Sequence, residues 1–343
     1  MIIIEKPLGI IGGGSFGTAL AVNFSRFIPD IFLKFRDKKT EEEISQRRIN
    51  DIYLPGVRIR ENVNITSDYE DIFENCGIVF LTIPSGSLRG VLTEIKSFRK
   101  DFNLNEYIFI NTAKGMGDKS MELPHRVFSE VMGGSLLERY AILSGPSFAV
   151  EVARNLPTAV CVASFNNGVL EELRRFFQGI MNFRVYTLND ILGVELGGSL
   201  KNIIAIAAGV SDGLNLGNNA RAALLTRGVV ELTRFGKAFG ADKQTFTGLS
   251  GLGDLMLTAS SNLSRNRTVG LRIGRGEILE SILKSMNTVA EGVETTRSVY
   301  RIAKEKGIYM PITGVVYSLL FEGLKPKEAI IKILERDIKN EFG

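Results

Sequence analysis

The chain contains few of the residues that build metal centres and disulfide frameworks. Its 343 residues include one histidine, two cysteines and no tryptophan. Cys76 and Cys161 lie far apart and neither belongs to a CxxC spacing, so neither a disulfide framework nor a zinc site is expected. A single histidine cannot supply a metal cluster. We therefore expect no metal site, and we interpret His125 as a surface or packing residue.

The chain also lacks a strong charge imbalance and a long apolar segment. Its net charge is +4 and no basic stripe with interleaved aromatics is present, so we expect no nucleic acid partner. Glu5, Lys6 and Pro7 interrupt the apolar N-terminus. The longest uncharged run beside Lys201 is far shorter than the ~20 residues that span a bilayer. We expect a globular cytoplasmic protein without a membrane span.

Strand-like and helix-like patterns alternate in the first half of the chain. Such alternation is typical of a parallel sheet covered by helices on both faces. It predicts an N-terminal, Rossmann-like doubly wound α/β domain over residues 1–186. The strand-like runs are 8–11, 30–35, 77–84, 106–113, 140–145 and 158–164, and helical patterns include 18–27 and 87–98.

The pattern changes after about residue 187, where β-branched runs largely stop. Alanine, leucine, glycine and charged residues then recur at helical spacing, which predicts a C-terminal all-α domain over residues 187–343. The helical patterns cover 190–212, 219–239, 264–275, 292–306 and 326–340.

A glycine-rich turn, GGGSFG, follows the first strand-like run. Gly12, Gly14 and Gly17 form the pattern G-x-G-x-x-G before a helix that begins near Ser15. Gly12 permits the tight turn, Gly14 lets a pyrophosphate approach the backbone, and Gly17 lets the helix pack on the strand. The phosphates would then lie at the positive end of the helix. We predict dinucleotide binding here; a purely structural turn is the alternative.

The end of the second strand-like run bears on which dinucleotide binds. Arg36 and Asp37 lie about 20 residues beyond the glycine turn, followed by Lys38 and Lys39. An acidic residue at this place holds a ribose 2′-hydroxyl, whereas an arginine accommodates a 2′-phosphate. The three cations favour NADPH, and Asp37 leaves NADH open. A solvated basic turn is the other interpretation.

A series of short motifs gives the chain a resemblance to one enzyme family. The glycine turn is common to many folds, but the LKN helix, GLSGLGDL and LSRNR together are highly specific. Over nearly its full length the chain resembles the bacterial-type NAD(P)-dependent glycerol-3-phosphate dehydrogenases. Phe16 stands where the family often has Trp, and Gly117 where Glu is frequent. The matching motifs are GGGSFGTALA (12–21), YLPG (53–56), IPS (83–85), AKGM (113–116), SGPSFAVEVA (144–153), VELGGSLKNIIAIAAGVSDGL (194–214), NARAALLTRG (219–228), GLSGLGDLMLT (248–258), LSRNR (263–267) and VAEGVETT (289–296).

This resemblance implies a fold, a reaction and a setting. The fold would be a Rossmann domain followed by a helical domain like that of 6-phosphogluconate dehydrogenase. The reaction would be reversible hydride transfer between NAD(P)H and dihydroxyacetone phosphate, which gives sn-glycerol 3-phosphate. Such enzymes usually supply glycerol 3-phosphate for glycerophospholipid synthesis, and a cytoplasmic homodimer is the family's expectation.

Lys201 is the best candidate for the proton donor that ketone reduction requires. On a helix its neighbours at i±3 and i±4 are mostly small, including Gly197 and Gly198, so a ligand could come close to that face. An apolar environment disfavours the ammonium form, and a second cation such as Lys114 would do so further. The resemblance implies that Lys201 is the general acid/base and that Lys114 contacts substrate. A lysine whose head reaches water is the alternative.

The segment LSRNR offers an anion site. Ser264 is the expected N-cap of a helix whose first turn contains Arg265, Asn266 and Arg267. Backbone amides and a guanidinium would converge there on a phosphate dianion. The resemblance implies that Ser264, Arg265 and Asn266 bind substrate and that Arg265 also reaches the cofactor. A solvated basic helix start is the alternative.

The resemblance also assigns residues that spacing alone does not. Asp254, in a glycine-rich turn, could orient a lysine, although a turn or helix cap is the commoner role for such a residue. The implied substrate contacts are Lys114, Gly145, Ser147, Lys201, Asn202, Asp254, Thr258, Ser264, Arg265 and Asn266. The implied cofactor contacts are Gly12, Gly14, Ser15, Phe16, Gly17, Arg36, Asp37, Tyr53, Pro84, Lys114, Ala149, Arg265, Val289 and Glu291.

Two other functions deserve comparison with this one. Another two-domain β-hydroxyacid-type dehydrogenase would share the Rossmann half, the helical half and a catalytic lysine, but LSRNR and GLSGLGD argue against it. A non-catalytic dinucleotide sensor would be expected to lack Lys201, Lys114 or Arg265, and the chain contains all three.

Overall fold

The structure is a computed structural model that describes residues 7–98, 102–116, 122–286 and 290–334. The chain divides into two compact units. Unit 1 comprises residues 1–115 and 122–195, and unit 2 comprises residues 116–121 and 196–343. The domain limits that we place at 186/187 from sequence stay a prediction. Each unit is described by itself.

Unit 1 is built on an eight-stranded sheet with the strand order β3-β2-β1-β4-β5-β6-β7-β8. All neighbours pair in parallel except β6 and β7, which are antiparallel. The order reverses at β1, which makes the edge beyond the carboxyl ends of β1 and β4 the expected ligand position in such a sheet. The strands are β1 (Leu8–Ile11), β2 (Ile31–Lys34), β3 (Val63–Thr66), β4 (Ile78–Leu81), β5 (Ile108–Asn111), β6 (Tyr140–Ser144), β7 (Thr158–Ala163) and β8 (Phe183–Leu188).

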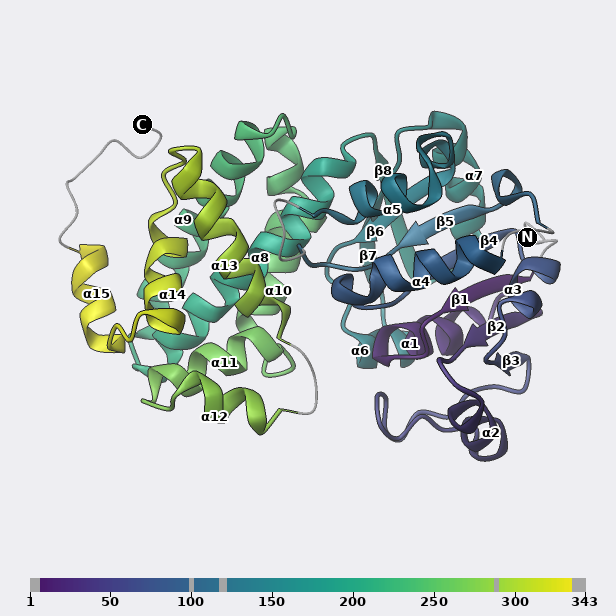
Figure 1. The fold of residues 1–343 in the computed structure, drawn as a ribbon. Coiled ribbons are helices and arrows are strands. Elements are labelled where there is room, and N and C mark those ends of the chain that lie inside the picture. Colours follow the sequence, from purple (N-terminus) through teal and green to yellow (C-terminus); the bar gives the residue numbers. More distant parts are fainter. Residues whose placement is uncertain (1–6, 99–101, 117–121, 287–289, 335–343) are drawn as a thin grey trace. The chain divides into compact units, whose positions relative to one another are not determined.

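Helices cover both faces of this sheet, as Figure 1 shows. One buried cluster packs α1, α2, α6 and α7 against one face, and a second packs α3, α4 and α5 against the other. Because both faces are covered, the central strands are apolar throughout; Ile10 and Phe80 point to one cluster, Ile11 and Leu81 to the other. The helices are α1 (Ser15–Phe24), α2 (Lys38–Arg47), α3 (Glu70–Asn75), α4 (Ser85–Phe98), α5 (Pro124–Met132), α6 (Ala149–Ala153) and α7 (Asn167–Gln178).

Unit 2 is helical, and its described residues contain no strand. The unit boundary falls within α8, whose residues up to Glu195 belong to unit 1. A π-helical turn, Leu249–Gly253, precedes α10. The helices are α8 (Ile191–Gly213), α9 (Gly217–Ala238), α10 (Asp254–Ser260), α11 (Arg265–Gly274), α12 (Leu279–Lys284), α13 (Glu291–Glu305), α14 (Pro311–Phe321) and α15 (Pro326–Leu334).

The helix α8 is long and apolar enough to cross a bilayer by length and composition alone. However, 89% of its most apolar stretch is buried inside the protein. A core helix has this burial, because its apolar side chains face protein instead of lipid. Its composition is therefore accounted for by packing.

Glycines let α8 and α11 approach backbone to backbone within unit 2. A Cβ on Gly270 would lie 1.9 Å from the carbonyl oxygen of Ile206, and one on Gly209 would lie 2.1 Å from that of Arg267. No side chain can occupy such positions. The small residues of α8 thus place α11, with the LSRNR segment at its start, directly against the helix that carries Lys201.

The architecture matches most of the sequence-based elements. Each of the six strand-like runs contains a strand, and the predicted helical segments contain α1, α4, α8, α9, α11, α13 and α15. The doubly wound sheet and the helical second half are confirmed. The strands β3 and β8 were not predicted, and no range was predicted for the helices α2, α3, α5, α6, α7, α10, α12 and α14.

Candidate active site

The glycine turn between β1 and α1 has the geometry that dinucleotide binding requires. Gly12 has a φ of +113°, which side-chain-bearing residues rarely adopt. A Cβ on Gly17 would lie 2.0 Å from the carbonyl oxygen of Gly12, so only glycine lets the helix pack there. Gly14 is the N-cap of α1, and no atom lies within 4 Å of the place where its Cβ would be. The backbone at Gly14 is therefore open to an approaching phosphate, and these residues fit a bound dinucleotide.

A buried asparagine that sequence analysis missed holds this turn. Asn50, which is 2% exposed, donates from its amide to the carbonyl oxygen of Gly13 and to the hydroxyl of Thr18, both at 2.8 Å. Nearby, the Ser15 hydroxyl donates to the carbonyl oxygen of Tyr53 at 2.6 Å. These hydrogen bonds fix the segment around residues 50–53 beside the glycine turn. The Tyr53 side chain in this segment is half exposed. Phe16 is partly buried against the core.

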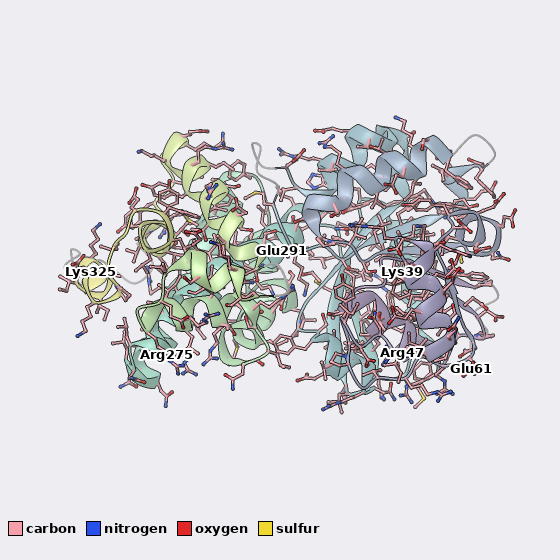
Figure 2. The ribbon with its side chains drawn as sticks, turned by 60° about the horizontal axis from the view of Figure 1, so that its bottom comes forward. Lys39, Arg47, Glu61, Arg275, Glu291 and Lys325 are labelled. Atoms are coloured by element: carbon pink, nitrogen blue, oxygen red, sulfur yellow. The ribbon has the colours of Figure 1, made fainter. Side chains whose placement is uncertain are left out.

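The charged residues in the loop from β2 to α2 differ in whether they have a partner within the protein. Asp37 caps α2 and accepts from the backbone amide of Thr40 at 2.9 Å. This hydrogen bond and a second from the Thr40 hydroxyl lower the pKa of the Asp37 carboxyl. Lys38 pairs with Glu41 at 2.8 Å. Arg36 and Lys39 are exposed and have no side-chain partner among the described residues, and Lys39 is marked in Figure 2.

The Lys114 amine lies at the carboxyl ends of β5 and β6. It donates to the carbonyl oxygen of Gly145 at 2.9 Å, and the Ser147 hydroxyl donates to the same oxygen at 3.0 Å. Gly145 has a φ of +132°, so a glycine is needed at this bend after β6. Three of the predicted substrate residues therefore meet. Pro84 is exposed before α4, and Ala149 begins α6.

Lys201 is buried at 5% exposure and engaged by a carboxylate. Its Nζ lies 2.6 Å from Oδ1 of Asp254, which is 2% exposed, and donates to the Thr258 hydroxyl at 2.8 Å. The Thr258 hydroxyl in turn donates to the backbone carbonyl of Asp254 at 2.6 Å. The Lys201 amine is thus paired inside the protein instead of solvated, and Asp254, which we expected could orient a lysine, is its partner.

Gly197, one of the small residues near Lys201, packs against protein backbone instead of leaving an open face. A Cβ on Gly197 would lie 3.0 Å from the carbonyl oxygen of Ser250, in the π-helical turn just before Asp254. Protein backbone, not an open face, therefore occupies the space beside Gly197. The glycine lets the GLSGLGD segment come close enough for Asp254 to pair with Lys201.

The LSRNR segment starts α11 as predicted, but its side chains have different partners. Ser264 is the N-cap and accepts from the backbone amide of Arg267 at 3.2 Å. Arg265 is exposed and has no side-chain partner among the described residues. Asn266 accepts from the backbone amide of Gly292 at 3.0 Å, at the start of α13.

Arg267 does not join the expected anion site. It is 8% exposed and pairs with Asp212 of α8 at 2.6 Å. Its guanidinium therefore holds α11 on α8. Glu291, marked in Figure 2, is the first residue of α13, and Asn202 is buried beside Gly292. Val289 lies outside the described residues.

A buried cluster around Glu195 in unit 1 was missed by sequence analysis. One carboxylate oxygen of Glu195 accepts from the His125 backbone amide at 2.9 Å and from the Tyr140 hydroxyl at 3.0 Å. The other lies 2.5 Å from Nδ1 of His125. Burial and the adjacent carboxylate hold the pKa of Tyr140 well above its usual range, so its hydroxyl stays protonated and donates. His125 is thus a packing residue, as expected, but with a charged partner.

The structure therefore assembles two sets of candidate residues. Unit 1 contains the glycine turn, the β2–α2 loop and the Lys114–Gly145–Ser147 contact. Unit 2 brings together Lys201, Asp254 and Thr258. Whether Lys114 and Lys201 share a substrate stays a prediction. Across the described part of the chain, no three His, Cys, Asp or Glu side chains are grouped to hold a metal.

Comparison with known proteins bears on both halves. The profile for the N-terminal part of NAD-dependent glycerol-3-phosphate dehydrogenase matches residues 7–170, and that for its C-terminal part matches residues 190–331. The glycerol-3-phosphate dehydrogenase [NAD(P)+] of Thermoanaerobacter sp. (strain X514) is 44% identical over 335 residues, 98% of each chain. The structure of the Coxiella burnetii glycerol-3-phosphate dehydrogenase is 38% identical, with a TM-score of 0.87, over 97% of this chain and 99% of that one. The Plasmodium falciparum structure, at 23% identity, 98% coverage of both chains and a TM-score of 0.85, supports the fold.

Proposed function

Because the chain belongs to the NAD(P)-dependent glycerol-3-phosphate dehydrogenase family, we propose that Lys201 is the general acid/base of its reaction. That reaction is the reversible reduction of dihydroxyacetone phosphate to glycerol 3-phosphate with NADH or NADPH. The observation that carries the proposal is the buried Lys201 amine, held by Asp254 and Thr258. When bound, the reduced nicotinamide supplies the hydride.

The chain's own contribution to the chemical step is a positioned proton. As the carbonyl carbon of the substrate accepts a hydride, its oxygen becomes an alkoxide and takes a proton from the Lys201 ammonium. The Asp254 carboxylate, 2.6 Å away, holds the amine in place and stabilises its charged form before transfer. In the reverse direction the neutral amine accepts the proton of the alcohol.

The substrate phosphate requires cationic and amide donors. Arg265 offers an exposed guanidinium at the start of α11, where backbone amides are also available. We assign Arg265, Ser264 and Asn266 to the phosphate, and Arg265 also to the cofactor. Lys114, Gly145, Ser147, Asn202 and Thr258 complete the proposed substrate set.

The cofactor set extends from the glycine turn. We assign the pyrophosphate to the turn and to the N-terminus of α1. Arg36 and Lys39 lack side-chain partners among the described residues while Asp37 is engaged as a helix cap, so a 2′-phosphate is the better match and NADPH the preferred cofactor. Tyr53, Pro84, Ala149, Val289 and Glu291 remain proposed contacts. We further propose a cytoplasmic homodimer that supplies glycerol 3-phosphate for phospholipid synthesis.

A spectrophotometric assay tests the function directly. Oxidation of NADPH and NADH is followed with dihydroxyacetone phosphate as substrate and with 2-keto acids as controls. We expect turnover with dihydroxyacetone phosphate alone. Turnover with a keto acid but not with dihydroxyacetone phosphate would mean a different dehydrogenase activity.

The role of Lys201 is tested with two substitutions. Lys201→Ala abolishes the proton donor but also leaves Asp254 buried and unpaired, which costs about 3–5 kcal/mol of stability. Lys201→Arg keeps a buried cation for Asp254, yet a guanidinium does not release its proton. We expect both to lower kcat by a factor of about 100 or more, with NADPH binding retained when measured by fluorescence. An active Lys201→Arg variant with unchanged circular dichroism would refute the assignment.

A further inference from the structure

The Glu195 carboxylate is buried where the helix α5 begins. Glu195 is 2% exposed and receives the His125 backbone amide at 2.9 Å. Pro124 is the first residue of α5, and Leu123, at its N-cap, provides no side-chain hydrogen bond. The first amides of a helix need acceptors, and a carboxylate near them is favourable. Glu195, from α8, therefore caps α5 in place of a residue from its own chain segment.

The same carboxylate connects to the strands that present Lys114. Tyr140, whose hydroxyl donates to Glu195 at 3.0 Å, is the first residue of β6. Gly145 follows that strand, and its carbonyl accepts the Lys114 amine at 2.9 Å. Asn111, the last residue of β5, pairs with Ile142 of β6 and precedes Lys114 by three residues. All these residues belong to unit 1.

We propose that Glu195 is a positioning residue: by holding α5 and β6 together through His125 and Tyr140, with β5 paired to β6 in the sheet, it sets the place from which Lys114 meets the substrate. This inference rests on the proposed role of Lys114. Glu195 itself is not among the residues that we assign to substrate or cofactor. Its loss would displace Lys114 but leave the glycine turn and the β2–α2 loop intact.

The chain provides a matched control in unit 2. Glu231, also 2% exposed, extends from α9 to the start of α14. It accepts from the backbone amides of Ile312 and Thr313 and from the Thr313 hydroxyl, so it caps a second helix that begins with proline. Glu231 is as buried as Glu195 and also caps the first turn of another helix. Neither α9 nor α14 contains a residue that we assign to the site.

Steady-state kinetics of the full-length chain test the proposal. Glu195→Ala is expected to raise KM for dihydroxyacetone phosphate by about 10- to 100-fold, since a displacement of about 1 Å has effects of this size. KM for NADPH should stay within about threefold of the parent, because the glycine turn and the β2–α2 loop, which hold most of the expected cofactor contacts, are untouched. Glu231→Ala should lower the thermal unfolding midpoint as Glu195→Ala does, and leave both KM values unchanged.

A conservative variant separates positioning from charge. In Glu195→Gln the amide oxygen still accepts from the His125 amide and the Tyr140 hydroxyl, and the amide nitrogen can donate to the neutral imidazole. We expect parent-like KM values. If Glu195→Ala yields no soluble protein, Tyr140→Phe removes only one hydroxyl of the cluster and should raise KM for dihydroxyacetone phosphate alone.

The remaining outcomes contradict the proposal. Equal KM effects for Glu195→Ala and Glu231→Ala, a Glu195→Gln variant that behaves like alanine, or an unchanged KM in whichever of Glu195→Ala and Tyr140→Phe is soluble would each overturn it. Lys114→Ala in the same assay distinguishes a failure of the substrate-site assignment from a failure of the positioning role of Glu195. If Lys114→Ala does not raise KM for dihydroxyacetone phosphate, the site assignment fails; if it does and Glu195→Ala does not, only the positioning role fails.

Discussion

The arginines of α11 show how neighbouring residues of one type are divided between structure and function. Arg267 is buried and pairs with Asp212, and Arg272 pairs with Glu277 near the other end of the helix. Arg265 is exposed at the first position and has no side-chain partner among the described residues. A guanidinium that the fold does not use is the one available to a phosphate.

Replacement of Arg265 by alanine should therefore weaken substrate binding without weakening the fold. A hydrogen bond to a charged group contributes about 1.5–3 kcal/mol, so KM for dihydroxyacetone phosphate should rise about tenfold or more. Arg275→Ala, an exposed arginine at the C-cap of the same helix and marked in Figure 2, is the matched control and should change nothing. An unchanged KM in Arg265→Ala would remove this residue from the site.

The β2–α2 loop gives a second prediction at this scale, on cofactor choice. Arg36→Ala should lower kcat/KM with NADPH by about tenfold or more and leave that with NADH nearly unchanged, because only NADPH carries the 2′-phosphate. Lys38→Ala is the control, since Lys38 is already paired with Glu41. Equal losses with the two cofactors would contradict the assignment of Arg36 to the 2′-phosphate.

A residue's role could be predicted from sequence when its partners lie close to it along the chain. The Ser264 cap and the glycine turn are local patterns, and both have the predicted geometry. Glu195 was missed because its partners His125 and Tyr140 lie 70 and 55 residues away. The pairing of Arg267 was missed for the same reason, because its partner Asp212 lies 55 residues earlier in another helix.

At the scale of elements, the crossing of α8 and α11 determines what surrounds Lys201. The glycines of both helices bring the backbones into contact, and Gly197 does the same for the segment that leads to Asp254. Small residues in an apolar helix thus reflect close packing as well as access for a ligand. The composition of α8 suggested open space beside Lys201, and the position of the neighbouring backbone shows that the space beside Gly197 is filled.

Two glycine-to-alanine substitutions in helices should have opposite effects on stability. In Gly270→Ala the new methyl group would meet the Ile206 carbonyl oxygen at 1.9 Å, so the helices must separate, which costs about 1–3 kcal/mol. Gly90 lies in α4, is exposed, and has no atom within 4 Å of an added Cβ. Gly90→Ala should therefore stabilise the protein by about 0.5–1 kcal/mol through helix propensity. Thermal unfolding followed by circular dichroism measures both; a lower midpoint in Gly90→Ala or an unchanged one in Gly270→Ala would contradict the packing argument.

Elements without a strong pattern escaped prediction. The strand β3 has the sequence VNIT, in which half the residues are polar, and β8 has FRVYTL with partly exposed positions. Both lie at the edges of the sheet, where the second face is less completely covered. The buried central strands, in contrast, are continuous apolar runs, and these were all recognised.

At the scale of the whole molecule, the proposed site residues come from both units. The glycine turn and Lys114 belong to unit 1, and Lys201, Asp254 and Arg265 belong to unit 2. The glycine turn can therefore be changed without touching the proton donor, and the proton donor can be changed without touching the glycine turn. Each loss has its own measurable consequence for the intact chain.

Ligand-linked stability tests this division, and Gly14 provides the sharpest variant. NADPH at about 100 times its dissociation constant stabilises the folded form by ~2.7 kcal/mol, so the unfolding midpoint should rise. Gly14 has a φ of −73° in the extended region and open space at its Cβ, so Gly14→Val should fold with nearly the parent midpoint. Its side chain would nevertheless fill the place of the approaching phosphate, and the shift with NADPH should vanish.

Lys201→Arg completes this experiment as the reciprocal variant, because it should keep the full NADPH shift while losing turnover. The four combinations of variant and cofactor are measured by thermal unfolding of the full-length chain, with NADH run alongside. A Gly14→Val variant that still responds to NADPH would mean that the dinucleotide binds elsewhere. A Lys201→Arg variant that loses the shift would mean that Lys201 contributes to cofactor binding and that the two functions are not divided between the units as proposed.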